Sequence, residues 1–379
     1  MKIITEYFKY LLAFIILVGA QSSGELLLAE PHNAPDSTAV TVLFAGDIMQ
    51  HTPQITAAKI NDSTYDYTPV FKYVKPIISK FDLAVANLEV TLAGEPYTGY
   101  PQFSAPDELA NAAKDAGFDV LCTANNHSCD RGDNGILRTV KTLKKTGIAR
   151  TGTYTDSIDF RNNHPLMIHK NDITVALFNY TYGTNGLPFH YPAMVSLIDS
   201  SHLVSDLKAA RRPGIDFIIV YFHWGQEYQS HPNHTQEELA QLAFNHGADV
   251  VIGSHPHVLQ RMEYYAPSDT TNGQLVVYSL GNYVSNQRDR FRDGGAMISF
   301  TLSKNWNGHR VSNPKYHLTW VYTPMEDGRK QYYILPVTQF ENDTTLDAAS
   351  LSKIRLFSND SRELFGNENR DVPEYPEKL

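Results

Sequence analysis

The sequence predicts an α/β protein built around a largely parallel β-sheet. Apolar runs such as TVLFAG (41–46) and IDFIIVYF (215–222) are continuous rather than alternating, which is typical of strands buried on both faces. Segments with helical spacing separate these runs, and two of them, 108–117 and 133–147, end at a glycine. Strand and helix therefore alternate repeatedly, which indicates parallel βα units.

The elements follow one another in a regular order. In the first half we expect helical turns at 69–81, helices at 108–117 and 133–147, and strands at 41–46, 83–89 and 118–125. In the second half we expect helices near 199–211 and at 236–247, and strands at 173–181, 215–222, 248–253 and 274–282. Residues 297–337 alternate in the manner of antiparallel strands. The polar end from Asn359 onward is expected to be loose.

The N-terminus predicts export. Lys2 and Lys9 precede and flank an apolar stretch at 11–18, and small residues follow up to Ala20, as in a secretory signal peptide. An uncleaved membrane anchor is the alternative, although the stretch is shorter than the roughly 20 apolar residues that span a bilayer. We expect a signal peptide at 1–20, a linker at 21–39, the main domain at 40–303, and a C-terminal β extension with a polar tail at 304–379. The mature protein would lie in the periplasm or on the outer face of a bacterial envelope.

Composition limits the classes of partner but does not decide whether the two cysteines form a disulfide. The chain has 379 residues, 42% of them apolar, and a formal net charge of −9 without long basic runs. This charge argues against nucleic acid as a partner. The two cysteines, Cys122 and Cys129, fit either packed thiols or a disulfide.

Polar side chains suited to metal binding or acid–base chemistry follow five of the predicted strands. These residues are Asp47, His51, Asn87, Glu89, Asn125, Asn126, His127, Asp130, His223, Glu227, His255 and His257. Because the carboxyl ends of parallel strands meet at one edge of a sheet, we expect these groups to converge there. Oxygen and imidazole ligands together suit Zn, Mn, Fe or Ni, and two such ions held by a bridging carboxylate would activate a water as a nucleophile.

Each of these residues also has a purely structural interpretation. Asp47 could cap backbone NH groups, Asn125 and Asn126 could be turn residues, and His223 could be a hydrogen-bonded core histidine. For any one residue alone the structural interpretation is favoured. However, a structural explanation would have to apply to every one of these residues at the same edge of the sheet. A functional site is therefore the favoured interpretation of the whole set.

Six motifs in order resemble those of CapA-like bacterial capsule-synthesis proteins, a family associated with poly-γ-glutamate production. The motifs are GDIMQH (46–51), NLE (87–89), NNHSCDRG (125–132), HWGQEY (223–228), GSHPHV (253–258) and SLGN (279–282). The resemblance implies a relationship to calcineurin-like metallophosphoesterases. It therefore implies a four-layer α/β sandwich with a dinuclear metal site at strand ends.

The resemblance also implies roles for individual residues. Glu89 would bridge two divalent transition-metal ions, and His127 would contact the scissile group and assist departure of the leaving group. The ligand set would be Asp47, Glu89, Asn126, His223, His255 and His257. The chain departs from the phosphoesterase pattern in two places: Met49 stands where a histidine is usual, with His51 as a substitute, and Glu89 stands where an aspartate is usual.

Further residues beside the motifs are candidates for substrate contact or for support of the ligands. An aromatic loop carries Tyr97, Tyr100 and Phe103, which could line a substrate pocket, and Arg131 could bind an anion. The alternatives are ordinary loop packing for the aromatic residues and a surface ion pair for Arg131. The other candidates are His51, Asn87, Asp130, Arg131, Trp224, Glu227 and Asn282.

Three functions remain open on the sequence. The first is a metal-dependent envelope enzyme of capsule or exopolymer metabolism that hydrolyses or transfers at a phosphoester or related bond, with an anionic polymer or phosphoester as substrate. The second is a non-catalytic polymer-binding or export subunit of a membrane capsule-synthase complex. The third is a metal-dependent amide hydrolase that acts on poly-γ-glutamate or peptidoglycan peptides.

Overall fold

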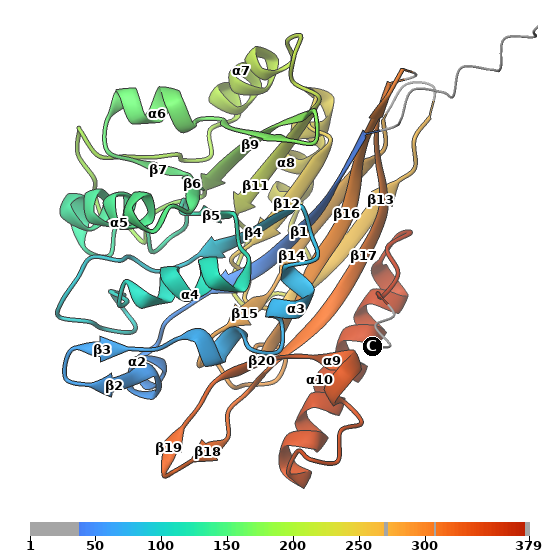
Figure 1. Ribbon diagram of the computed structural model, residues 1–379. Coiled ribbons are helices and arrows are strands. Elements are labelled where there is room, and N and C mark those ends of the chain that lie inside the picture. Colours follow the sequence, from blue (N-terminus) through green and yellow to red (C-terminus); the bar gives the residue numbers. More distant parts are fainter. Residues whose placement is uncertain (1–37, 269–271, 307, 376–379) are drawn as a thin grey trace, which may run out of the picture. The chain divides into compact units, whose positions relative to one another are not determined.

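Two β-sheets packed face to face form the centre of the protein in a computed structural model, which describes residues 38–268, 272–306 and 308–375 (Figure 1). The first sheet has the strand order β20-β17-β16-β1-β4-β5-β6, and β15 pairs with β1. Its strands are β1 (Thr38–Ile48), β4 (Leu83–Leu88), β5 (Val120–Cys122), β6 (Ala149–Thr151), β15 (Asn282–Val284), β16 (Gly294–Asn305), β17 (Gly308–Tyr322) and β20 (Tyr333–Pro336). From β1 to β6 the pairing is parallel, whereas β16, β17 and β20 pair antiparallel.

The second sheet has the order β13-β14-β12-β11-β9-β8. Its strands are β8 (Leu166–Lys170), β9 (Ile173–Thr181), β11 (Phe217–His223), β12 (Val250–Ser254), β13 (Leu259–Tyr265) and β14 (Gln274–Leu280). The four inner strands are parallel and both edge strands are antiparallel. Small two-stranded ribbons join β2 (Lys59–Asn61) to β3 (Thr64–Tyr65), β7 (Thr153–Tyr154) to β10 (Met194–Val195), and β18 (Met325–Glu326) to β19 (Arg329–Lys330).

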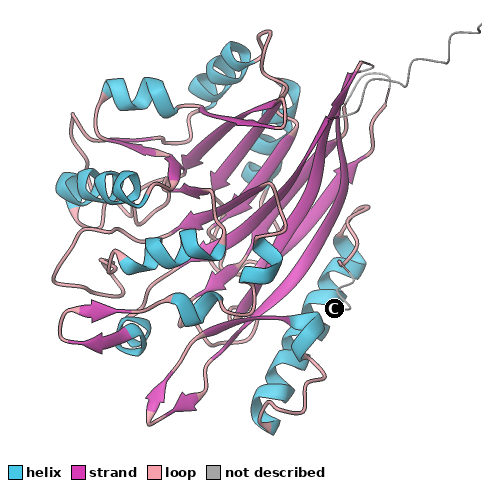
Figure 2. Cartoon of the chain, viewed as in Figure 1, coloured by secondary structure: helices cyan, strands magenta, loops and turns pink. Residues whose placement is uncertain are grey.

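Helices cover the outer faces of both sheets (Figure 2). The helices α3 (Lys75–Ile78), α4 (Glu108–Ala116) and α5 (Gly132–Thr146) pack on the first sheet, and α7 (Ser200–Ala210) and α8 (His234–Asn245) pack on the second. Shorter helical segments are α2 (Thr52–Ala58), the 3-10 helix η1 (Thr68–Phe71), α6 (Ser157–Asn163) and α9 (Val337–Phe340). The four-layer α/β sandwich is thereby confirmed.

Alternation of side chains along each strand builds the layers. In β1, Val42 and Phe44 face the core between the sheets, whereas Leu43 packs under the helices of the first sheet. In β11, Ile219 belongs to the core between the sheets and Val220 to the helix-covered face of the second sheet. Successive residues of a strand point to opposite faces, so both faces of these strands are apolar and their sequences read as continuous apolar runs.

The prediction of largely parallel strand pairing is confirmed for the inner strands, which divide between two sheets with antiparallel strands at their edges. The expected strand at 173–181 is β9, and the helix expected at 133–147 is α5, which begins and ends one residue earlier. A continuous apolar run shows that both faces of a strand are buried. It does not show which sheet the strand joins, since that depends on long-range pairing.

The C-terminal segment differs most from expectation. Residues expected to be loose belong to helix α10 (Ala348–Glu368), which lies beside β17 in Figure 1. Asp347 caps this helix by accepting hydrogen bonds from two backbone NH groups. Ile354, Phe357 and Phe365 follow a helical spacing and are buried in the core between the sheets. The helix is stable because tertiary contacts cover this face, which its polar composition does not reveal.

The signal-peptide prediction lies outside the described residues. Within the part of the chain that is described, none of the helices combines the length and the apolar character that a membrane crossing requires.

Candidate metal centre

Two histidines with unusual backbone conformations follow strand β12. His255 has φ 98° and His257 has φ 58°, in the left-handed region that residues other than glycine rarely adopt. Such conformations cost roughly 1–3 kcal/mol each and persist where the surrounding structure over-determines them, often at ligand sites. Both imidazoles are buried. The GSHPHV turn therefore keeps a strained backbone that holds two histidines at one place.

Two buried carboxylates meet these histidines. Asp47 lies near the end of β1 and Glu89 directly follows β4, and both side chains are fully buried. The Oδ2 atom of Asp47 is 3.3 Å from Nδ1 of His257, and Oε1 of Glu89 is 3.7 Å from Nε2 of the same ring. Glu89 belongs to two groups with metal-ligand spacing, one with His255 and His257 and one with Asp47 and His223.

His223 adds the second sheet's contribution to the centre. It is the last residue of β11, and its Nε2 lies 3.6 Å from Oε1 of Glu89. The same nitrogen lies 2.8 Å from Oδ1 of Asn126, and the Oγ of Ser254 lies 3.0 Å from Nδ1. The contact of Nδ1 with Ser254 orients the ring, so that Nε2 faces Glu89 and Asn126 and is the nitrogen that could bind a cation.

The centre is formed by strand ends from both sheets. Asp47 lies near the end of β1, and Glu89 and Asn126 follow β4 and β5 of the first sheet. In the second sheet, His223 ends β11, and His255 and His257 follow β12. The convergence predicted from the sequence is confirmed, but the expected single sheet edge is replaced by two facing edges.

The residues present fit a bound cation. Three buried atoms of the centre lack a hydrogen-bond partner within the described structure: Glu89 Oε1, His255 Nδ1 and His257 Nδ1. The last of these is close to Asp47 but not aligned for a hydrogen bond. Buried polar atoms without partners are uncommon and costly, and carboxylate oxygens with neutral imidazole nitrogens are the donors that Zn, Mn, Fe and Ni accept.

The pKa shifts of the buried groups also favour a bound cation. Burial, with the neighbouring charge of Asp47, raises the pKa of Glu89 well above its usual value. Burial and the neighbouring imidazoles lower the pKa of His223 far below its usual value, and burial with His257 lowers the pKa of His255 to about 3. The imidazoles of His223 and His255 are therefore neutral at pH 7, as metal ligands must be, and the buried carboxylates beside them favour a positive charge in the centre.

Asn87 and Asn125 hold the carboxylates in place. The Nδ2 of Asn87 donates to Oδ1 of Asp47 at 2.8 Å, and its Oδ1 accepts from Nδ2 of Asn125 at 3.3 Å. Asn125 Nδ2 also donates to the carbonyl of Leu88 at 2.8 Å, next to Glu89. Asn87 thus supports the ligands, as its place in the NLE motif indicates.

His127 forms a buried pair with Asp130. The ring donates from Nδ1 to Oδ2 of Asp130 at 2.8 Å, and the same oxygen accepts from the backbone NH of Phe103 at 2.7 Å. The Phe103 ring packs edge-on against the imidazole, with centroids 4.6 Å apart. Within the described residues, Nε2 of His127 has no hydrogen-bond partner, so it is the nitrogen available for proton transfer.

The remaining candidates divide between the rim of the centre and the surrounding structure. His51 packs edge-on against Phe103 and accepts from the NH of Asn286 at 3.3 Å, and it belongs to neither ligand group. Glu227 is close enough for its charge to raise the pKa of Glu89. Asn282 donates to the carbonyls of Arg292 and His257.

Two candidates point away from the centre. Arg131 donates to Thr98 and to the carbonyl of Pro96, so it fastens the aromatic loop. Trp224 packs under α8 and donates to the carbonyl of Tyr278 at 2.9 Å. The two cysteines are free and buried.

Sequence reasoning did not single out three residues of the site. Tyr182 lies over His255, with ring centroids 4.6 Å apart, and Ser254 contacts His223. Asn179 accepts from the backbone NH groups of Thr123 and Ala124 at 3.0 and 2.7 Å, and so fixes the chain leading into Asn126 and His127. Tyr182 directly follows β9, so the rule that found the other residues at strand ends also applies to it.

Comparisons with known proteins agree with the motif series. Residues 41–287 match the family "Bacterial capsule synthesis protein PGA_cap". The chain is 29% identical over 304 residues to the capsule biosynthesis protein CapA of Bacillus anthracis, covering 77% of this chain and 71% of the relative. It is 31% identical over 288 residues to the PGA biosynthesis protein CapA of Bacillus subtilis, covering 72% and 70%. A solved structure titled a novel phosphatase, from Mycoplasma pneumoniae, aligns with TM-score 0.45 and 14% identity over 74% of this chain and 93% of that one. The chain belongs to the PGA_cap family of bacterial capsule synthesis proteins.

Proposed function

We propose that this protein is an exported, metal-dependent enzyme of capsule-polymer metabolism that hydrolyses or transfers at a phosphoester or related bond. The observation that carries the proposal is the convergence of two buried carboxylates and three buried imidazoles, with three of their polar atoms left without partners. Stability alone does not explain such a cluster, because unpaired buried polar atoms cost free energy.

The ligands would be Asp47, Glu89, Asn126, His223, His255 and His257. Glu89 is shared by both ligand groups, so it is the residue suited to bridge two ions. Divalent transition metals would lower the pKa of a bound water and polarise the bond to be broken. Zn, Mn, Fe and Ni all suit this donor set.

The chain's own residues would supply the proton for the leaving group. His127 is oriented by Asp130 through Nδ1, which leaves Nε2 to donate. Phe103 packs against the ring and limits its rotation. Asn87 orients Asp47 and Glu89 by donating to one oxygen of each.

The setting follows from the family. Relatives named for capsule and PGA biosynthesis support an anionic polymer as the surrounding substrate and the cell envelope as the location. Export by residues 1–20 and association with a membrane capsule-synthase complex belong to this proposal.

The test is metal content and turnover of the full chain purified without chelator. We expect a His255→Ala/His257→Ala variant to lose its metal and to lose activity on phosphodiesters by more than the roughly 10–100-fold that removal of an outer supporting residue costs. A His202→Ala/His234→Ala variant, which removes two exposed imidazoles, is the matched control and should keep both.

Three outcomes would revise the proposal. Wild-type protein that takes up none of the four metals would support a non-catalytic polymer-binding subunit instead. Metal-dependent release of amino groups without release of phosphate would assign an amide hydrolase. Equal metal content in the two double variants would place the metal elsewhere.

A further inference from the structure

Tyr182 lies at the boundary between the buried ligands and solvent. It directly follows β9, and its backbone NH donates to the carbonyl oxygen of His223 at 2.9 Å. Its ring lies over the His255 imidazole, with centroids 4.6 Å apart, and is nearly parallel to that of His223, with centroids 6.3 Å apart. Both imidazoles are buried, whereas Tyr182 is 47% exposed. The tyrosine therefore covers part of the proposed ligand set and also reaches the solvent from which a substrate would enter.

The backbone around Tyr182 is fixed on both sides. Thr181 donates from Oγ1 to the carbonyl oxygen of Gly183 at 2.9 Å, and the carbonyl oxygen of Thr181 accepts from the NH of Ile198 at 2.8 Å. A group that binds substrate is most effective on a support that does not move, because no binding energy is then used to order it. Tyr182 has such a support in its backbone contacts and in the stacking of its ring.

The hydroxyl group of Tyr182 carries a proton that no close acceptor takes. It forms a side-chain hydrogen bond with Asn126, a proposed ligand. Within the described residues, the acceptor that faces it is Oδ1 of Asn185, 3.5 Å away, which also accepts from Nδ2 of Asn126 at 3.3 Å. The charges of Glu89 and Glu227 reach the hydroxyl, but neither carboxylate accepts a hydrogen bond from it. Since a tyrosine hydroxyl keeps its proton at neutral pH, it is a neutral donor with a weak contact to give up.

Asn126 connects this hydroxyl to the position that a cation would take. Its Nδ2 is directed to Asn185, while its Oδ1 lies 2.8 Å from Nε2 of His223. A phosphoryl group bound at a cation beside these residues would carry negatively charged oxygens. Hydrogen bonds donated to charged oxygens are roughly twice as strong as those between neutral groups, and a donor that is already in position needs no reorganisation to make one.

We propose that Tyr182 is a further substrate-binding residue of this centre, whose hydroxyl donates a hydrogen bond to a negatively charged oxygen of a tetrahedral group such as a phosphoryl group. This inference rests on the proposed function and adds to it a donor that selects an oxyanion at the bond to be broken. The stacking on His255 sets the direction of the hydroxyl. The substrate oxygen would replace the weak contact with Asn185.

Tyr182→Phe tests the proposal, because it removes the hydroxyl and keeps the ring over His255. Calorimetric titration of the Mn-loaded full chain with inorganic phosphate is the measurement. We expect the affinity for phosphate to fall roughly 10–100-fold, since a hydrogen bond to a charged group is lost. The kcat/KM for phosphodiester hydrolysis should fall by a similar factor, whereas metal content and the thermal unfolding midpoint should not change. Tyr191→Phe removes a hydroxyl from a tyrosine that is 77% exposed, and should bind phosphate as the wild type does.

Four outcomes would overturn the proposal. They are wild-type affinity for phosphate in Tyr182→Phe, an equal loss of affinity in Tyr191→Phe, and a wild type that holds metal but binds no phosphate. The fourth is a loss of metal in Tyr182→Phe with unchanged phosphate affinity after reloading, which would make Tyr182 a support for Asn126 instead. Failure of the proposed enzyme function would appear in the wild type itself, as missing metal or missing turnover, before any variant is compared.

Discussion

At the scale of single residues, the proposed metal centre depends on a few side chains that have no good partner among the described residues. Glu89 and His255 each leave one buried polar atom unpaired, and His255 and His257 both keep a strained backbone. His127 is different, because Asp130 and Phe103 satisfy its Nδ1 side and hold its ring. This contrast separates the proposed ligands from the proposed proton donor.

Replacing His127 by Gln tests this separation. We expect kcat for phosphodiester hydrolysis to fall about 10²–10⁴-fold, because a positioned general acid contributes about that much. Metal content should not change, since His127 belongs to neither ligand group. Steady-state kinetics and elemental analysis of the same sample are the measurements, and loss of metal along with activity would make His127 a ligand instead.

At the scale of elements, β17 carries a buried histidine far along the chain from the proposed metal ligands. The ring of His317 contacts Ser299 Oγ at 2.9 Å and stacks on Tyr375, with centroids 4.4 Å apart. Burial, with the charges of Lys315 and Lys80, lowers the pKa of His317 from 6.5 to about 3.

Because the pKa of His317 is lowered in the folded protein, this residue makes the protein less stable at low pH. Between pH 6.5 and about 3 the unfolded chain binds a proton that folded His317 does not, so stability falls as the pH falls through this window and is unaffected above it. Below pH 6.5, one such histidine lowers the free energy of unfolding by about 1.4 kcal/mol per pH unit, which amounts to about 2 kcal/mol at pH 5.

Urea unfolding at pH 7 and pH 5 measures this effect. Between pH 7 and pH 5, we expect the free energy of unfolding of His317→Gln to fall by about 2 kcal/mol less than that of the wild type. The other titrating groups are common to both proteins, so the difference reports on His317. Equal losses in the two proteins would contradict the pKa of about 3.

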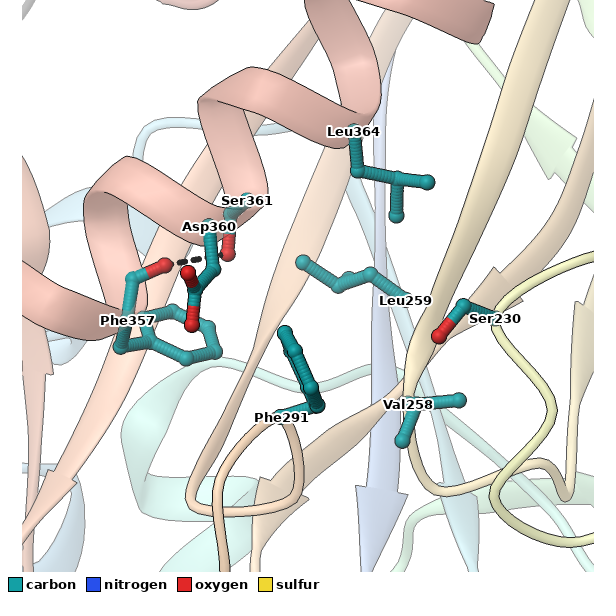
Figure 3. A pocket seen from close by; sticks show the side chains of 8 residues that line it. All are labelled: Ser230, Val258, Leu259, Phe291, Phe357, Asp360, Ser361 and Leu364. Atoms are coloured by element: carbon teal, nitrogen blue, oxygen red, sulfur yellow. Dashed lines mark hydrogen bonds between the residues drawn. The ribbon is translucent and has the colours of Figure 1, made fainter.

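At the scale of the whole described molecule, α10 closes the sandwich. Its contacts reach β13, the edge of the second sheet, and β17 of the first. Phe365 is 3% exposed and packs against Tyr316 with ring centroids 4.6 Å apart. The helix thereby completes the core between the sheets and lines a cavity of about 80 Å³ (Figure 3).

Truncating Phe365 to Ala should therefore destabilise the protein by about 3–5 kcal/mol, the usual cost of removing a buried aromatic ring. Leu356→Ala on the same helix is the control, because Leu356 is 46% exposed and its loss should cost within about 0.5 kcal/mol. Chemical denaturation of both variants is the measurement. Similar small losses would show that α10 is not part of the cooperative core.

The sequence by itself determined the local elements and the chemistry at their ends. Apolar runs and helical spacing are properties of neighbouring residues, so β9 and α5 could be located from them. The rule that ligands follow strand ends then selected Asp47, Glu89 and His223. The ordered motifs indicated the PGA_cap family, which the comparisons confirm.

Only the tertiary structure decided how these parts face one another. His223 points towards Glu89 and Asp47, whereas Trp224 points into the core under α8, because consecutive residues of an extended chain face opposite ways. The tertiary structure also decided how the strands divide between two sheets and how α10 packs against them. Pairing of distant strands and burial of one helix face are set by contacts between residues far apart in the chain, which local pattern does not encode.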